Sequence, residues 1–296
     1  MRKLLLGMCL VAAVAIVPPW LSASARQAAQ ETTPAPVFEV ASIKANKSGD
    51  TNGMLRRQPG GRINATNMPL RPLIQFAYTL APYQLVGGPG WMAGERYDIV
   101  AKMEGNPSPV APGAGPDPAQ LALRGLLEDR FKLKVHRETR EMDIYALVMA
   151  KPRGSPGPNL KPTTQDCAAA AAAAQRGAPP PPGSNVPFCG IQGGPGRIKF
   201  GGLPVSAFGQ AFSGQAGRMV VDRTGLNGSW DFELNFAVEG RGGQIGGPAG
   251  QDAPAPDPNA PSFFTAIQEQ LGLKLESTKG PVEVLVIDSI EHPVED

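Results

Sequence analysis

The chain has 296 residues, with 28 Lys and Arg against 26 Asp and Glu and a formal net charge of +2. This near-neutrality provides no general electrostatic attraction for nucleic acid, so a nucleic-acid partner is not expected. The 36 glycines and 32 prolines cluster in a few stretches, which predicts ordered blocks separated by loose linkers.

The N-terminus has the pattern of a secretory signal peptide at residues 1–25. Arg2 and Lys3 precede an apolar run at 4–17, and Ala23-Ser24-Ala25 supplies the small residues after which signal peptidase cleaves. The apolar run is shorter than the roughly 20 residues that span a bilayer, and an uncleaved anchor is the alternative. Cleavage would leave a neutral chain outside the cytoplasm, periplasmic or secreted, with no further membrane span.

Two cysteines, Cys167 and Cys189, would remain after cleavage. In an oxidising compartment we expect them to form a disulfide, and a loop of about 20 residues is worth roughly 3 kcal/mol on the chain-entropy model. A metal site is the alternative, but no histidine or second cysteine pair lies nearby. The third cysteine, Cys9, follows Met8, where lipidation requires a small residue.

Stretches rich in proline and glycine divide the rest of the chain. Residues 26–36 are expected to be a flexible lead, and VFEVASIKA then alternates apolar and polar residues, which predicts a first strand. Residues 151–195 hold a run of alanines, a run of prolines and the cysteine pair, without periodicity, and predict a linker. We therefore expect one α+β half at 37–150 and another at 196–296.

The first half is expected to run strand, helix, two strands, helix and two closing strands. A strand at 62–66 precedes a helix over 70–80, which opens near a proline because proline suits the first turn. Beyond a loop at 104–118, apolar residues at helical spacing predict a second helix with the stripe Leu123, Leu126, Leu127 and Phe131. FKLKVHRE then alternates and predicts a strand with Phe131, Leu133 and Val135 facing inward.

The second half has corresponding elements in the same order. A strand at 197–200 precedes a helix over 205–215, and a loop at 239–261 precedes a second helix with the stripe Phe263, Ile267 and Leu271. EVLVID is more continuously apolar and is expected to be the better buried closing strand.

The two halves also resemble each other residue by residue. Gly61-Arg62-Ile63 recurs as Gly196-Arg197-Ile198, and RYDIVAKMEG resembles SWDFELNFAVEG. Chance similarity is the alternative, but we predict an internal duplication. The expected fold class is α+β, with two pseudo-repeated β-α-β-β-α-β-β halves whose antiparallel or mixed sheets carry helices on one face.

The stretch VVDRTGLNGSWDFEL, residues 220–234, suggests either a catalytic site or a turn. Asn227-Gly228 between β-rich runs favours a tight turn, because both residues tolerate positive φ. The corresponding stretch of the first half, GGPGWMAGERYDI, shares only the aspartate after an aromatic residue, Asp98 and Asp231. We therefore prefer the turn to catalysis.

No constellation of residues identifies a reaction. The two histidines, His136 and His292, have no ligand partner at metal-binding spacing, and no nucleophile elbow, phosphate-binding loop or zinc-binding helix motif is present. Basic residues near Arg137 interleave with acidic ones, which indicates a mixed exposed face. We predict no catalytic residue, no metal and no cofactor.

Long stretches of the chain resemble a known family. They include FEVASIK, GRINATNMPLRPLIQFAY, GGPGWMAGERYDIVAK, LLEDRFKLKVHRETREMDIYALVMAK, VVDRTGLNGSWDFEL and FTAIQEQLGLKLESTKGPVEVLVIDSIEHP. Together they span about residues 37–293 and are similar to the soil-associated exported bacterial proteins, a domain of unknown function with many paralogues per genome. The resemblance implies an exported protein and transfers no activity, ligand or catalytic residue.

Three functions fit these observations. The first is a non-catalytic binding or interaction module whose aromatic and glycine-rich corners contact an envelope, peptide or polysaccharide ligand. Its candidate binding residues are Tyr83, Trp91, Arg223 and Trp230. The alternatives are a secreted hydrolase that uses Asp98, Asp222 or Asp231 as acid or base, and a structural protein of the envelope.

Overall fold

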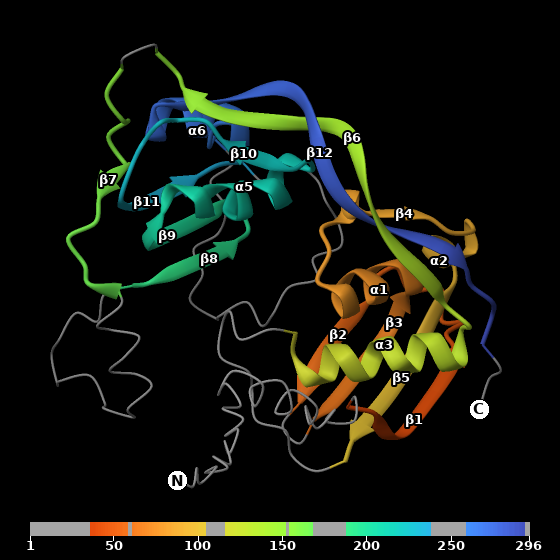
Figure 1. Ribbon diagram of the computed structural model, residues 1–296. Helices are drawn as coiled ribbons and strands as arrows, with labels where there is room; N and C mark the ends of the chain where they lie inside the picture. Colours follow the sequence, from red (N-terminus) through yellow and green to blue (C-terminus); the bar gives the residue numbers. More distant parts are fainter. Residues whose placement is uncertain are drawn as a thin grey trace, which may run out of the picture. The chain divides into compact units, whose positions relative to one another are not determined.

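The computed structural model describes residues 36–58, 61–104, 116–151, 154–167, 188–237 and 259–293. The expected signal peptide and all but the last residue of the expected lead lie outside these ranges. Within them the chain forms three four-stranded sheets and five α-helices, so the predicted α+β class is confirmed (Figure 1).

Sheet A is antiparallel and belongs to the first half of the chain. Its strand order is β1 (Phe38–Ala45), β5 (Arg96–Met103), β3 (Arg62–Pro69) and β2 (Met54–Gln58). Helices α1 (Leu70–Tyr78) and α3 (Pro118–Arg130) lie across one face of it (Figure 1). Val100 and Lys102 of β5, which point to the other face, are exposed, as an antiparallel sheet allows.

The two helices of the first half follow from local sequence. Helix α1 buries Leu70, Leu73 and Ile74, and it ends at Thr79 with φ of 55°. Helix α3 begins after Asp117, whose carboxylate accepts a hydrogen bond from the Ala119 N–H. Its predicted apolar stripe is buried against sheet A, which confirms that expectation.

Sheet C is also antiparallel, with the order β7 (Lys161–Pro162), β11 (Ser229–Asn235), β9 (Arg197–Pro204) and β8 (Gly190–Gly194). A 3-10 turn at Val205–Ala207 leads into α5 (Phe208–Ala216), and α6 (Phe263–Leu271) follows β11 along the chain. Phenylalanines fill the core between them; the rings of Phe200 and Phe232 stack with centroids 4.8 Å apart, and Phe208 meets Phe232 edge-on at 5.2 Å.

Parts of the expected linker belong to sheet C. Strands β7 and β8 lie within 151–195 and form the two edges of the sheet. Leu160, immediately before β7, is buried in the same core as Ile198. These short strands carry no periodic pattern because an edge strand of two to five residues buries few side chains.

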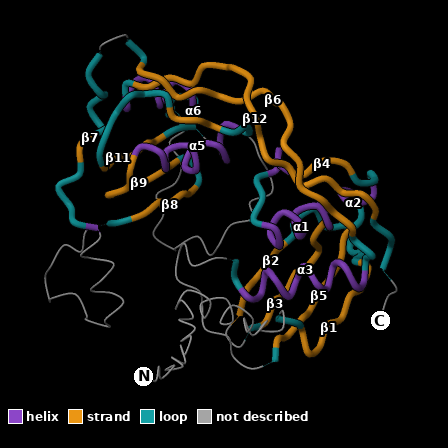
Figure 2. Tube along the Cα trace, viewed as in Figure 1, coloured by secondary structure: helices purple, strands orange, loops and turns teal. Residues whose placement is uncertain are grey.

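Sheet B joins both halves of the chain. Its order is β10 (Val220–Asp222), β6 (Lys134–Met149), β12 (Leu273–Ser289) and β4 (Leu85–Gly87). Strands β6 and β12 pair antiparallel without interruption from Leu273 opposite Met149 to Ile287 opposite Val135, and the tube in Figure 2 shows them running side by side. Each half was expected to end in two strands, whereas each ends in one long strand.

The short strands of sheet B pair across the halves. Strand β4, from the first half, lies parallel to β12, and β10, from the second half, lies parallel to β6. Because β10 is in sheet B and β11 is in sheet C, Asn227-Gly228 connects two sheets and does not close a hairpin. The equivalent strand orders of sheets A and C are compatible with internal duplication, which stays a prediction.

Candidate functional site

A cleft of about 400 Å³ lies over the middle of β6 and β12, and we call it the central cleft. Four of its lining residues are largely apolar: Tyr83, Met142, Met219 and Val282. Four others are charged: Glu141, Asp143, Arg218 and Lys279. The lining therefore combines segments next to both edges of sheet B with the two long strands between them.

Alternation along the strands builds the apolar part of the cleft. Val282 and Val284 of β12 are buried with Ile144 of β6, and the side chains of Met142, Met219 and Tyr83 pack against them. Gly280 makes this packing possible, because a Cβ at that position would lie 2.6 Å from Cδ1 of Ile144. The result is a third, small core that is separate from those of sheets A and C.

Tyr83 is positioned by the 3-10 turn Pro82–Gln84 that precedes β4. The Gln84 side chain fixes this turn through two hydrogen bonds. Its Oε1 accepts a hydrogen bond from the Ala81 N–H at 3.0 Å, and its Nε2 donates to the Glu283 carbonyl at 3.1 Å. The second contact ties the turn to β12, so Tyr83 has a fixed position at one side of the cleft.

The charges of the cleft differ from those nearby. Along β6 and β12, Arg140 pairs with Glu138, and Arg137 pairs with Glu283. Within the residues that the structure describes, Glu141, Asp143, Lys279 and Arg218 have no ion-pair partner. Arg218 instead lies over the Tyr145 ring at 5.2 Å and donates to Ser277 Oγ at 3.4 Å.

This arrangement is suited to binding. Two methionines provide a surface that can adapt to an apolar group, since their side chains are unbranched and polarisable. The surrounding carboxylates and cations could contact charged or hydrogen-bonding groups on either side of that apolar group. The cleft therefore offers contacts to a ligand that carries both kinds of group.

Of the four predicted binding residues, the structure places one in the cleft. Tyr83 lines it, whereas Arg223 is exposed just after β10, with its N–H bonded to the Leu147 carbonyl. Trp230 is only 8% exposed, and its indole N–H donates to the Asn227 carbonyl at 3.0 Å. The burial of Trp230 reflects its inward position on β11, next to the phenylalanine core.

Trp91 lies in a different cluster, at the start of α2 (Trp91–Gly94). Its ring stacks on His292 with centroids 4.1 Å apart, and His292 Nε2 lies 3.1 Å from Glu95 Oε1. The Tyr97 hydroxyl donates to the other oxygen of Glu95 at 2.8 Å. These hydrogen bonds, first that of Tyr97 and then that of His292, lower the pKa of Glu95.

The three aspartates considered for acid–base chemistry each shape local backbone. Asp98 accepts from the Asn67 N–H at 2.8 Å, and Asp231 accepts from the Gly202 N–H at 2.7 Å, and the two donor residues have φ of 53° and 64°. Asp222 accepts from both the N–H and the hydroxyl of Thr224. Asp98, Asp231 and Asp222 belong to sheets A, C and B respectively.

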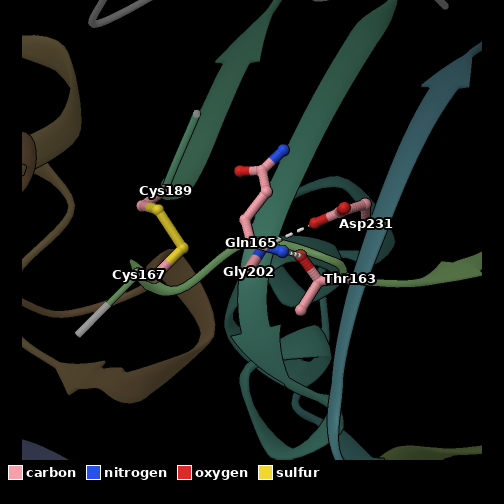
Figure 3. The surroundings of a disulfide bond; sticks show 6 residues. All are labelled: Thr163, Gln165, Cys167, Cys189, Gly202 and Asp231. Atoms are coloured by element: carbon pink, nitrogen blue, oxygen red, sulfur yellow. Dashed lines mark hydrogen bonds between the residues drawn. A yellow bond between two sulfur atoms is a disulfide. The ribbon is translucent and has the colours of Figure 1, made fainter. Parts of the chain in front are cut away.

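The predicted disulfide between Cys167 and Cys189 is confirmed, with a Cα–Cα distance of 5.6 Å (Figure 3). It lies against β9 next to Gly202, where an added Cβ would meet Cys167 Sγ at 1.9 Å. The disulfide thus links the chain after one edge strand of sheet C to the start of the other. Within the described residues, no group of His, Cys, Asp and Glu is arranged to hold a metal ion.

Sequence reasoning missed most of the cleft. Met142 and Lys279 lie in strands whose sequence indicates an exposed face of mixed charge, and Met219 precedes a strand of only three residues. Only the register of β6 with β12 and the parallel pairing of β10 bring these residues together. The single signal was the apolar Met142 among charged neighbours on a strand.

In the described part of the chain no helix is both long and apolar enough to cross a bilayer.

Comparison with known proteins gives a match to one family model. No curated protein and no solved structure matches the chain significantly. Residues 71–290, which include every lining residue of the central cleft, match the family described as protein of unknown function, DUF3738. The chain therefore belongs to the DUF3738 family.

Proposed function

We propose that this protein is a non-catalytic, extracytoplasmic binding module that holds an apolar group of its ligand in the central cleft. The observation that carries the proposal is a set of charges around an apolar cleft that have no ion-pair partner among the described residues, at the point where both halves of the chain meet in sheet B. Charged groups that form no ion pair with a neighbouring side chain can contact the charges of a partner.

Export is supported by two features. The N-terminal residues have the charge, apolar run and small residues of a secretory signal. The Cys167–Cys189 disulfide is compatible with an oxidising compartment, where such bonds persist. Separation of periplasm, medium and membranes, followed by detection of the protein, tests this part of the proposal.

A peptide fits the cleft better than a polysaccharide does. Sugar binding commonly relies on aromatic platforms, and the lining has a single aromatic residue, Tyr83. Methionines are typical of surfaces that accommodate varied apolar side chains of peptides. Carboxylates and cations in one cleft also suit a chain that carries both signs of charge.

The test compares two methionines that are replaced by lysine in the mature protein. Met142→Lys adds a cation to the apolar part of the cleft, while Met54→Lys makes the same change on β2, where Met54 is already 47% exposed. The probes are an immobilised library of random peptides and a panel of soluble neutral and acidic polysaccharides.

We expect capture of a subset of the peptides, with affinity lowered at least tenfold by Met142→Lys and unchanged by Met54→Lys. Equal loss in both variants, or capture of polysaccharides that does not depend on Met142, would contradict the proposal. Thermal unfolding of both variants provides the control for folding.

A further inference from the structure

Among the described residues, the outer edge of β6 is unpaired over part of its length. There, strand β10 pairs with β6 only at Tyr145, Ala146 and Leu147, and the segment from Arg137 to Asp143 has β12 on one side alone. Of the side chains in this segment, Arg137, Thr139, Arg140, Glu141 and Asp143 are exposed.

Pro281 shows which backbone groups point outward. It has no N–H and lies opposite Glu141, so this pair is one that exchanges no hydrogen bonds across β6 and β12. Because bonded and non-bonded pairs alternate in an antiparallel ladder, the odd-numbered residues of β6 direct their N–H and C=O groups away from β12. Two observed bonds agree, since Tyr145 N–H donates to the Met219 carbonyl at 2.8 Å and the Leu147 carbonyl accepts from Arg223 at 2.9 Å.

The vacant groups are therefore those of Arg137, Thr139, Glu141 and Asp143. In the part of the chain that the structure describes, none of them bonds another backbone group across this edge. Alternate residues of a strand repeat at about 6.8 Å, with one donor and one acceptor each. The chemical complement of such a row is the backbone of another extended polypeptide.

The equivalent edge of β12 is less available. Pro281 removes one donor there, and Gln84 already bonds the Glu283 carbonyl. Proline and occupied carbonyls are ways in which proteins protect an edge from pairing. On β6 the corresponding position is Glu141, which keeps its N–H.

The cleft lies beside the vacant edge of β6. Glu141, Met142 and Asp143 belong to both, and Gly217, Arg218 and Met219 lead from the cleft into β10. In an added strand, residues next to Met142 would project on the side of sheet B where the Met142 side chain lies. Residues next to Glu141 and Asp143 would project on the opposite side, toward these two carboxylates, which have no ion-pair partner among the described residues.

We propose that an extended peptide with alternating apolar and basic residues adds to β6 along residues 137–143. This inference rests on the proposed binding function and names its ligand class and binding mode. The apolar side chain enters the central cleft, and the basic ones lie opposite Glu141 and Asp143. The peptide would occupy the same edge of β6 as β10 does, at residues that precede those paired with β10.

The experiment uses acetylated and amidated seven-residue peptides in which Val and Lys alternate, and the same peptides with Glu in place of Lys. Glu141→Pro removes the outward N–H while leaving the bonds to β12, as Pro281 does on the opposite strand. Glu141→Gln is its matched control, because it removes the charge and retains the N–H.

We expect the Val/Lys peptides to bind the mature protein and to slow amide hydrogen exchange at Thr139, Glu141 and Asp143. Glu141→Pro should weaken this binding at least tenfold, and Glu141→Gln should weaken it less. Alternate N–H groups of a bound peptide point toward β6 and away from it, so two sets of alternate nitrogens can be methylated. Methylation of the set that faces β6 should abolish binding to the unchanged protein, and methylation of the other set should not. This comparison tests the proposal even where Glu141→Pro does not fold.

Three results would overturn the inference. The first is absence of binding of the Val/Lys peptides at about 1 mM. The second is equal binding of the Glu peptides. The third is binding that Met142→Lys removes but that remains unchanged in Glu141→Pro and after methylation of either set of alternate peptide nitrogens. In that third case the cleft still binds a peptide, so the proposed function stands while strand addition fails.

Discussion

At the scale of single residues, Asp98 and Asp231 do the same structural work in different sheets. Each follows an aromatic residue on a strand, and each accepts a hydrogen bond from the N–H of a residue with positive φ on the neighbouring strand. The donor is Asn67 in sheet A and Gly202 in sheet C. Both residue types adopt this conformation at low cost, so the aspartate can fix an irregularity in the pairing of its sheet.

Gly202 has a further constraint, because the disulfide packs on its Cα. We predict that Gly202→Ala lowers the free energy of unfolding by about 2 to 4 kcal/mol, through the contact with Cys167 Sγ and the unfavourable φ. Chemical denaturation of the variant measures this loss. In a background with both cysteines changed to serine, the loss of stability should be smaller. An equal loss would show that the unfavourable φ of residue 202, and not the contact with the disulfide, causes it.

Gly280 permits the packing beneath the central cleft. Gly280→Ala would bring a Cβ to 2.6 Å from Cδ1 of Ile144, the movable end of a side chain, so we predict a loss of about 1 kcal/mol in stability. Ile144→Val removes that Cδ1. The double variant should therefore be no less stable than Ile144→Val alone, and additive losses in denaturation experiments would refute the contact.

Glu95 should make stability depend on pH. Hydrogen bonds from Tyr97 and then His292 lower its pKa in the folded state, so its contribution is present above the pKa of the unfolded chain and is lost as the pH falls through the folded value. Unfolding measured from about pH 5 to about pH 3 should show this loss. Glu95→Gln should flatten that part of the profile, and an unchanged slope would show that other carboxylates cause it.

At the scale of elements, the disulfide clamps the two edges of sheet C. Cys167 follows β7 and Cys189 precedes β8, with 22 residues between them in sequence. We predict that changing both cysteines to serine lowers the free energy of unfolding by about 3 kcal/mol, since the cross-link restricts the unfolded chain. Denaturation of the variant beside the oxidised protein gives the value, and a difference within error would mean that the loop is already constrained without the bond.

The elements that sequence predicted well are those whose signal is local. The stripe of Leu123 and Leu127 repeats within one helix, so its burial follows from spacing alone. Of the alternating Phe131, Leu133 and Val135, the first two are buried and Val135 is half-buried, but the strand begins only at Lys134, later than the pattern predicted. Strands β4 and β10 were harder to assign to a sheet because three residues such as Leu85–Gly87 carry no period, and their partners lie far along the chain. Tyr83 was identified as an aromatic at a glycine-rich corner, while Met142, Met219 and Lys279 become neighbours only through sheet B.

At the scale of the whole molecule, the halves of the chain depend on each other. Strand β4 of the first half finds its partner in β12, and Leu285 and Ile287 of β12 are buried in the same core as Leu73 and Leu123 of the first half. In return, β10 pairs with β6, and Leu147 of β6 belongs to the core of the second half. Neither core is complete without a strand from the other part of the sequence.

This exchange predicts that residues 36–150 do not fold cooperatively when they are produced alone. The fragment would lack β12, and β6 would lose the strand that pairs with it over nearly its whole length. Without β12, apolar side chains around Leu85 would also be exposed to water, at a cost of roughly 25 cal/mol per Å². Circular dichroism during heating of the fragment should therefore show no sharp transition.

Production of residues 36–150 together with residues 151–296 provides the complementary measurement. If β6 and β12 hold the halves together, the two fragments should copurify in a one-to-one complex through a tag on either one, with a single thermal transition. The change Met142→Pro in the fragment of residues 36–150 should prevent assembly. Met142 lies opposite Gly280 in a pair that forms hydrogen bonds across the two strands, and proline has no N–H to donate. The same change at Glu141, whose N–H points outward, should leave assembly intact. A cooperative transition in residues 36–150 alone would show instead that sheet A with its two helices is an independent domain.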